Sequence, residues 1–191
     1  MKIFEWMIED VIAAHRDLYL DHCVAMAVAL MSQKSGLPYE FIVNCEGMNL
    51  PAVDGEGSFL LRVSWTESTA AKVERVLQTE QRKAIAERAA VALAALLFAK
   101  LIPQAEMRVT KSGDRADFWI SQLRCALEVS GTEYHRELSH RHREKIVQVL
   151  RNPLQWNAYV VVCCFDTPKG LIKWSYHEQK EKTYAPFKIG T

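Results

Sequence analysis

The segment MRVTKSGDRADFWISQLRCALEVS, residues 107–130, predicts the core of the fold. It holds three short runs with strand character, separated by the turn-forming residues Lys111–Asp114 and Ser121–Gln122, and therefore predicts a three-stranded antiparallel meander. Asp117 lies in the second run and Glu128 in the third, both next to apolar residues. Because an unpaired carboxylate is costly to bury there, we expect an arginine, backbone amides or a divalent cation to compensate each acid.

Apolar patterning predicts the elements that follow and precede the meander. Residues 67–100 contain no Gly or Pro and are rich in helix formers, and the apolar stretch 89–99 predicts that the second half of this helix packs on a sheet. A further helix is predicted over residues 133–150. Residues 158–165 form an unbroken apolar run, typical of an interior strand covered on both faces, and a last short strand is expected near residues 171–176.

The amino-terminal part predicts mixed structure. Residues 3–34 show helical spacing of apolar residues and predict two helices or one bent helix. Within them residues 23–31 are nearly all apolar and form either a buried helix or a partner surface. Residues 39–44 and 59–65 predict two strands that pair as a ribbon around a loop.

Together the elements predict an α/β fold with a mixed sheet flanked by helices. A helix precedes the antiparallel meander, and a helical crossover then leads to a strand parallel to its neighbour. The length of 191 residues suits one core with a small appendage. The expected organisation is an extension of helices and a β-ribbon over residues 1–66, an α/β core over 67–176 and a polar tail over 177–191.

Charge is unevenly distributed along the chain. The net charge is +1, but residues 1–60 carry three basic and nine acidic side chains, so this part has a charge of −6 and the remainder +7. The basic part favours contact with a polyanion such as DNA, and the alternative is an ordinary solvated surface with mild asymmetry. The acidic amino-terminal helices are candidates for a homodimer interface or for contact with a protein partner.

Features of membrane, secreted and disulfide-bonded proteins are missing from the sequence. There is no run of about 18 uncharged apolar residues, and the start MKIFEW lacks the basic region and apolar core of a signal peptide. The five cysteines are an odd number without a Cys-x-x-Cys pair, which favours free thiols in a core. We therefore expect a cytoplasmic protein without membrane contact.

The order of elements over roughly residues 67–165, with an acid in the second and third strands, resembles the PD-(D/E)xK nuclease superfamily. In that motif an Asp is followed, one strand later, by Asp or Glu, any residue and Lys. Asp117 matches the first position and Glu128 the second, whereas Ser130 stands where the lysine is expected. The resemblance implies a restriction-endonuclease-like fold and a nuclease that hydrolyses DNA phosphodiester bonds with Mg²⁺ or Mn²⁺.

The resemblance also implies a metal site. Two carboxylates on adjacent strands hold Mg²⁺ with open positions for a phosphate oxygen and a water, so Asp117 and Glu128 are the expected metal ligands. Glu87 on the preceding helix is the candidate third ligand, and Glu80 is a weaker one. The two strand acids meet only if the pairing register places both on one face of the sheet, which the sequence does not define.

The helix predicted after Ser130 supplies candidates for the missing cation. Lys145 or Arg136 would reach back over the end of the sheet, and Ser130 and Lys145 complete the expected catalytic set with the two acids. Arg136, Arg143 and Gln148 are the candidate nucleic-acid ligands. Gln148 lies three residues from Lys145 on one helical face and resembles a functional Gln of the RecB-like branch.

Structural interpretations of the same residues stay open. Asp117 alternatively forms a salt bridge with Arg115 or Arg124, and Glu87 and Lys145 are alternatively solvated helix residues. If Ser130 marks lost chemistry, the chain is a catalytically degenerate nuclease-fold subunit that binds nucleic acid or a protein partner.

A cysteine, three histidines and three tryptophans also have a functional and a structural interpretation. Cys125 as a nucleophile has no supporting signature. The histidines of the helix predicted over residues 133–150 do not have the spacing of zinc ligands, so this helix presents either a phosphate-facing or a solvated surface. The tryptophans either stack on bases or fill the core. The histidines are His135, His140 and His142, and the tryptophans are Trp119, Trp156 and Trp174.

Overall fold

The computed structural model describes residues 1–34, 36–48, 50, 53, 57–102, 105–110, 116–152, 156–166 and 168–179. The helical elements are α1 (Asp10–Ala14), η1 (Arg16–Leu18), α2 (Asp21–Lys34), α3 (Glu67–Ala70), α4 (Val73–Thr79), α5 (Arg82–Leu101) and α6 (His135–Leu150). The strands are β1 (Lys2–Met7), β2 (Tyr39–Glu46), β3 (Ser58–Ser64), β4 (Met107–Val109), β5 (Phe118–Ile120), β6 (Cys125–Thr132), β7 (Ala158–Cys164) and β8 (Gly170–His177). The protein is therefore an α/β protein.

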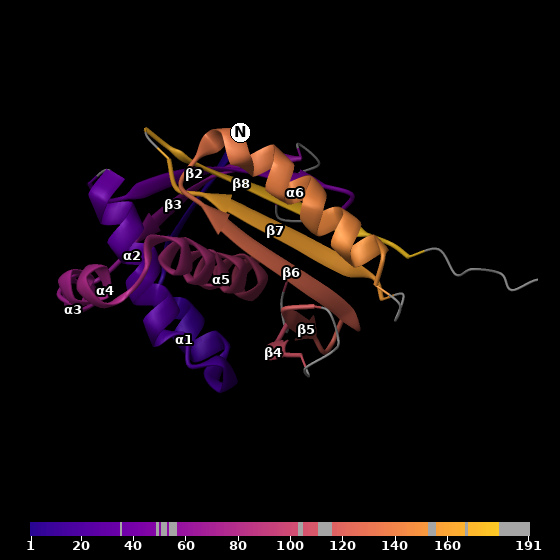
Figure 1. The fold of residues 1–191 in the computed structure, drawn as a ribbon, viewed down its shortest axis with the longest axis horizontal. Coiled ribbons are helices and arrows are strands. Elements are labelled where there is room, and N and C mark those ends of the chain that lie inside the picture. Colours follow the sequence, from indigo (N-terminus) through magenta and orange to yellow (C-terminus); the bar gives the residue numbers. More distant parts are fainter. Residues whose placement is uncertain are drawn as a thin grey trace, which may run out of the picture.

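All these strands form one mixed, eight-stranded sheet in the order β1-β3-β2-β8-β7-β6-β5-β4 (Figure 1). The meander β4-β5-β6 is antiparallel, and α6 connects β6 to β7, which lie parallel, as the sequence predicts. β2 and β3 pair as the predicted antiparallel ribbon. This ribbon joins the rest of the sheet through a parallel pairing of β2 with β8, so the amino-terminal strands extend the same sheet.

Helices cover both faces of the sheet. α5 lies on one face against β6 and β7, with α2 packed beside it, and α6 lies on the other face over β6, β7 and β8 (Figure 1). β7 lies between these layers and is almost fully buried, as its apolar run predicts. The sheet therefore separates two hydrophobic clusters, a larger one under α2 and α5 and a smaller one under α6.

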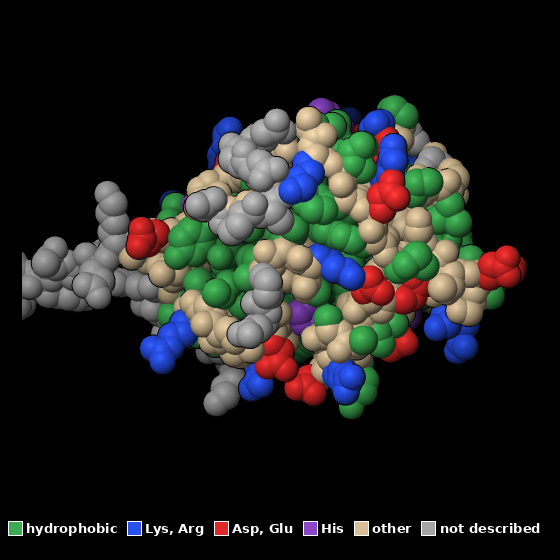
Figure 2. All heavy atoms as spheres, turned by 180° about the vertical axis from the view of Figure 1, so that it is seen from behind, with side chains coloured by type: hydrophobic (Ala, Val, Ile, Leu, Met, Phe, Trp, Pro, Cys, Tyr) green, Lys and Arg blue, Asp and Glu red, His purple; other side chains and the backbone are tan. Residues whose placement is uncertain are grey.

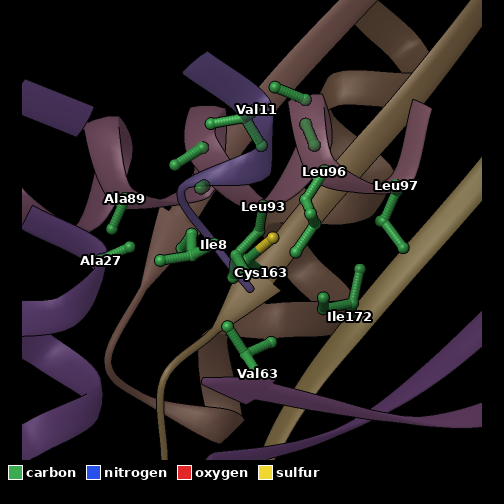
Figure 3. Packing of buried hydrophobic residues seen from close by; sticks show 14 of the residues in the cluster. Ile8, Val11, Ala27, Val63, Ala89, Leu93, Leu96, Leu97, Cys163 and Ile172 are labelled. Carbon is green, nitrogen blue, oxygen red and sulfur yellow. The ribbon is translucent and has the colours of Figure 1, made fainter. Parts of the chain in front are cut away.

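The apolar half of α5 forms the centre of the larger cluster. Ala27 of α2 and Ala89 of α5 face each other, and small side chains at this contact allow the two helices to approach closely (Figure 3). Leu93 of α5 lies close to Cys163 of β7 in the same cluster (Figure 3). Residues 24–31 of α2 are buried in this layer, so the interpretation of this segment as a buried helix is confirmed.

Two predicted helices differ from the observed elements. The prediction of helix from residue 3 is wrong, because Lys2–Met7 is a strand that pairs in parallel with β3. Its half-buried Phe4 and Trp6 alternate with exposed residues, which is the period of a strand. The single helix predicted over residues 67–100 is instead α3, α4 and α5, because Glu80 has an extended backbone between α4 and α5.

The surface on the far side of Figure 1 shows hydrophobic side chains in its middle, with charged side chains around them (Figure 2). Among the described residues, no helix combines the length and hydropathy needed to cross a membrane. The predicted turn at residues 111–114 and the tail from residue 180 onward lie outside the described residues.

Candidate functional site

The register of the meander brings Asp117 and Glu128 together. Phe118 of β5 pairs with Leu127 of β6 at the end of this antiparallel ladder, and continuing the register by one residue puts Asp117 opposite Glu128. Directly opposite residues of an antiparallel pair project to the same face. The two acids therefore share the face of the sheet that α6 covers.

Lys145 of α6 reaches both of these carboxylates. Its Nζ lies 2.5 Å from Oε2 of Glu128 and 3.7 Å from Oδ2 of Asp117. The Glu128 side chain is fully buried, whereas 22% of Lys145 and 40% of Asp117 remain exposed. A lysine from the helix, and not from position 130, thus lies beside the two acids.

The environment of Glu128 disfavours its charged form. Burial and then the negative charge of Asp117 raise the pKa of Glu128 to about 7, although Lys145 opposes this shift. Burial by itself would lower the pKa of Lys145, but its contacts with Glu128, Asp117 and Glu87 outweigh burial and raise it. The lysine therefore stays cationic, and its positive charge faces two carboxyl groups, of which the buried Glu128 has a raised pKa.

A second cluster adjoins the first through Ser130. The Ser130 hydroxyl donates to Oε1 of Glu87 at 3.3 Å, and the Arg141 guanidinium lies 2.9 Å from the same oxygen. Arg141 also contacts Ser130 at 3.4 Å and Glu137 at 3.1 Å. Glu87 of α5 and Arg141 of α6 therefore meet at β6, although the helices that carry them cover opposite faces of the sheet.

Asp117 and Glu87 also bind the outer edge of β6. The described part of β5 pairs with β6 only as far as Leu127. Beyond it, the N–H of Val129 donates to Asp117 at 2.8 Å and the N–H of Gly131 donates to Glu87 at 3.0 Å. Backbone amides that a neighbouring strand would otherwise bind are thus satisfied by carboxylates, which fixes the position of both side chains.

Gly131 allows α5 to approach this edge. A Cβ at this position would lie 1.9 Å from the carbonyl oxygen of Ala86, which is an impossible contact. Ala86 directly precedes Glu87, so the close approach of the helix backbone to β6 brings the Glu87 carboxylate within reach of the Gly131 amide. A side chain at position 131 would push α5 away from β6 and separate this pair.

The other predicted acids and cations lie elsewhere. Glu80 contacts His22 and Arg88 at the junction of α4 and α5 and is not part of these clusters. An α-helix turns by about 100° per residue, which places Arg136 and Arg143 on the side of α6 roughly opposite Lys145. Both arginines are exposed. Gln148 is also exposed and lies on the same side of the helix as Lys145.

Several alternative interpretations are decided by burial and contacts. Burial raises the pKa of Cys125 to about 11, so this thiol is not an activated nucleophile. His142 is buried and hydrogen-bonds Ser175, whereas His135 and His140 are exposed. Trp174 is fully buried in the core. Arg115, one of the alternative partners of Asp117, lies outside the described residues.

A basic cavity lies beside the Arg141 cluster. One part, with a volume of about 290 Å³, is lined by Arg82, Lys83 and Arg141 together with Glu133 and Glu137. A more open part of about 680 Å³ shares Lys83 and Arg141 and continues along α6. Arg82 and Lys83 carry no sequence signal for this site. Arg141 belongs to the helix that is expected to be phosphate-facing or solvated, and it lies one helical turn before Lys145 on a shared face.

One feature of the Asp117 and Glu128 carboxyl groups suits a bound cation. Oε1 of Glu128 is buried and has no hydrogen-bond partner among the described residues, and a buried polar atom without a partner is costly. A hard divalent cation binds carboxylate oxygens of this kind. Within the described part of the chain, no three His, Cys, Asp or Glu side chains are close enough to form a ready metal-binding group. The carboxylates that converge beside Lys145 are therefore the pair Asp117 and Glu128.

Comparisons of the chain with protein-family models, with curated proteins and with solved structures gave no match.

Proposed function

We propose that the protein is a Mg²⁺-dependent nuclease of the PD-(D/E)xK type that hydrolyses phosphodiester bonds in DNA. The observation that carries the proposal is the convergence of Lys145 with Asp117 and Glu128. These are the three charges that the motif requires, and the ammonium takes the role of the lysine that Ser130 replaces.

The arrangement of elements supports a restriction-endonuclease-like core. α5, the meander β4-β5-β6, the crossover helix α6 and the parallel strand β7 follow each other in the order that the resemblance implies. The strands β1, β3 and β2 join the sheet on the far side of β8, away from the two acids. They therefore extend the core and leave the edge of β6 beside Asp117 unchanged.

Asp117 and Glu128 would hold the metal ion, since one oxygen of Glu128 has no partner and the neighbouring carboxylate lies on the same face. When bound, Mg²⁺ would neutralise charge on the phosphoryl oxygens and increase the acidity of a bound water. Glu87 is a weaker candidate for a ligand, because Arg141, Ser130 and Gly131 already bind its carboxylate.

The cations of the site have separate tasks. Lys145 stays protonated and donates hydrogen bonds, so it would orient the attacking water and stabilise negative charge that develops on the phosphate. Arg141, held by Glu87 and Glu137, presents a fixed guanidinium one helical turn away. Its place beside the basic cavity suits contact with a phosphate next to the scissile bond.

The proposal is tested by nicking of supercoiled plasmid and cleavage of labelled oligonucleotides with Mg²⁺, Mn²⁺ or EDTA. We expect metal-dependent cleavage that falls about 10³-fold in Asp117→Asn and Lys145→Met, because each variant removes several kcal/mol of charge stabilisation. Asp10→Asn and Lys100→Met are controls, since these two residues form a partly exposed ion pair of the same residue types outside the site. Cleavage that persists in Asp117→Asn would contradict the assignment.

A degenerate, non-catalytic protein of the same fold is the second candidate. The observation that favours it is the internal pairing of the charges, because Lys145 contacts both acids and Arg141 contacts Glu87. Calorimetry with Mn²⁺ separates the two candidates. Binding that Glu128→Gln abolishes supports the metal enzyme, whereas no binding and no cleavage by the wild type would support the degenerate subunit.

A further inference from the structure

Two different surfaces flank the Asp117–Glu128 pair, an aromatic one and a basic one. We propose that the substrate is single-stranded DNA, whose bases stack on Trp119 while its phosphates follow the basic cavity between α5 and α6. This inference rests on the proposed nuclease function, for which it names the form of the substrate.

The aromatic surface is next to the acids on the same strand. Trp119 lies two residues after Asp117, about 7 Å along β5, and projects to the same face. Its ring centroid is 4.7 Å from that of Trp156, and the planes are tilted by 59°. Both rings are only half-buried, in contrast to Trp174 of the core. An exposed aromatic face binds an unpaired base by stacking, whatever the base.

The basic surface begins on the other side of the acids. Lys83, Arg136 and Arg141 line the open part of the cavity together with Glu137 and Glu144. Arg82 lines the narrower part and pairs with Glu133 there, so Lys83 and Arg136 are the cations of this lining that form no ion pair with a carboxylate among the described residues. The guanidinium of Arg136 lies 5.5 Å from the centre of the exposed Tyr134 ring, which holds it at the cavity. Cations along a groove bind successive phosphates without reading sequence.

Direct contacts connect the two surfaces through the proposed catalytic groups. Arg141 contacts Ser130 of β6. Glu128, two residues before Ser130 on the same strand, contacts Lys145. Lys145 approaches Asp117, and Asp117 is followed on its face by Trp119. A strand bound at the cavity and at Trp119 would therefore pass the carboxylates between its two points of attachment.

The geometry favours a single strand over a duplex. In a duplex the base faces stack on each other, so Trp119 would have no free face to bind. The side chain of Glu128 is fully buried behind Lys145, and a phosphate on one flexible strand reaches such a group more easily than one held in a rigid double helix. The half-buried tryptophan pair and the buried acid thus point to the same substrate.

The test is fluorescence anisotropy in EDTA with a labelled oligo-dT and a duplex of equal length. We expect oligo-dT to bind at least about tenfold more tightly and Trp119→Leu to weaken it about tenfold, since base stacking has an effect of this size. Trp119→Phe keeps an aromatic face and should restore most of the binding. Trp6→Leu is the matched control, because Trp6 is also half-buried beside an aromatic ring, that of Phe4 on β1.

Salt titration tests the basic surface. Lys83→Gln and Arg136→Gln should each reduce the slope of log K against log salt by roughly one. Lys72→Gln and Arg75→Gln, at a separate cavity between α2 and α4, should leave it unchanged. Equal binding of duplex and oligo-dT, or equal effects of Trp119→Leu and Trp6→Leu, would overturn the inference. If either of these results occurred and the protein still cleaved duplex DNA, the single-strand inference would fail and the proposed nuclease function would be supported. If oligo-dT binding depended on Trp119 but no divalent ion supported cleavage, only the proposed nuclease function would be contradicted.

Discussion

Two buried titratable side chains show opposite solutions to the cost of burying a polar group. His15 is 2% exposed and both ring nitrogens have partners, the carbonyl of Ala95 at 3.1 Å and the N–H of Met107 at 3.4 Å. Burial lowers the pKa of His15, so its neutral form is stabilised. Glu128 is also buried, but one of its oxygens has no partner among the described residues and burial with Asp117 raises its pKa.

This difference separates a buried group that is fully satisfied from one that is not. The contacts of His15 connect the start of the chain with α5 and β4, and every polar atom of its ring is satisfied. The Glu128 site has surplus acceptors and repelling charges, which fold stability alone does not favour. Proteins retain such costly arrangements where a ligand or a reaction uses them. The comparison therefore supports a functional role for Glu128.

Removal of Lys145 should have the largest effect on stability. Lys145→Met leaves Glu128 buried without its cation, and breaking a buried pair costs about 3–5 kcal/mol of unfolding free energy. Urea denaturation measures this change. Lys100→Met, which breaks the exposed pair with Asp10, should cost less than about 1 kcal/mol.

The double variant sharpens this prediction. Glu128→Gln combined with Lys145→Met removes the buried charge together with its partner, so most of the lost stability should return. If the double variant is as unstable as Lys145→Met, packing of the lysine stem and not charge pairing explains the loss.

The pH dependence of stability should differ in sign between the two groups. The pKa of Glu128 is raised from 4.5 to about 7, so its folded form binds more protons than its unfolded form in this range. The stability that it contributes is fully present below pH 4.5 and is lost as the pH rises through 7. Relative to Glu128→Gln, the wild type should lose about 3 kcal/mol across this window.

His15 should act in the opposite direction. Its lowered pKa means that the unfolded state binds the extra proton, so stability is fully present above pH 6.5 and falls as the pH drops below that value. Parallel urea curves of wild type, Glu128→Gln and a His15 variant across the pH range measure both effects. A wild type that becomes more stable than Glu128→Gln as the pH rises would show that the carboxyl is satisfied in the fold.

Replacement of His15 should have the smallest effect of the three. His15→Leu keeps an apolar body but leaves the Ala95 carbonyl and the Met107 amide without their partner, which costs about 2 kcal/mol. His22→Leu is the matched control, since His22 is about half-exposed and its bond to Glu80 is at the surface. Cleavage per folded molecule should be unchanged in His15→Leu, and a specific loss of activity would end the contrast with Glu128.

The sequence signals of the candidate site are local. Asp117 and Glu128 interrupt strands that are otherwise suited to a core, which marks both acids as needing compensation. Lys145 was a candidate because it lies on the helix that follows Ser130. The contacts of Arg141 and Gly131 with Glu87 are not predictable in this way, because Glu87 lies more than forty residues away in the chain and only the packing of α5 on β6 brings them together.

The sequence by itself determined the α/β class, the meander, the crossover helix and the buried strand β7, because each depends on the hydrophobic period of a single segment. The tertiary structure decided the rest. It made Lys2–Met7 a strand, joined β2 to β8 and set the β5–β6 register that places Asp117 opposite Glu128. These features depend on pairing between distant segments, and a shift of one residue in register would move a side chain to the other face of the sheet without any change in local pattern.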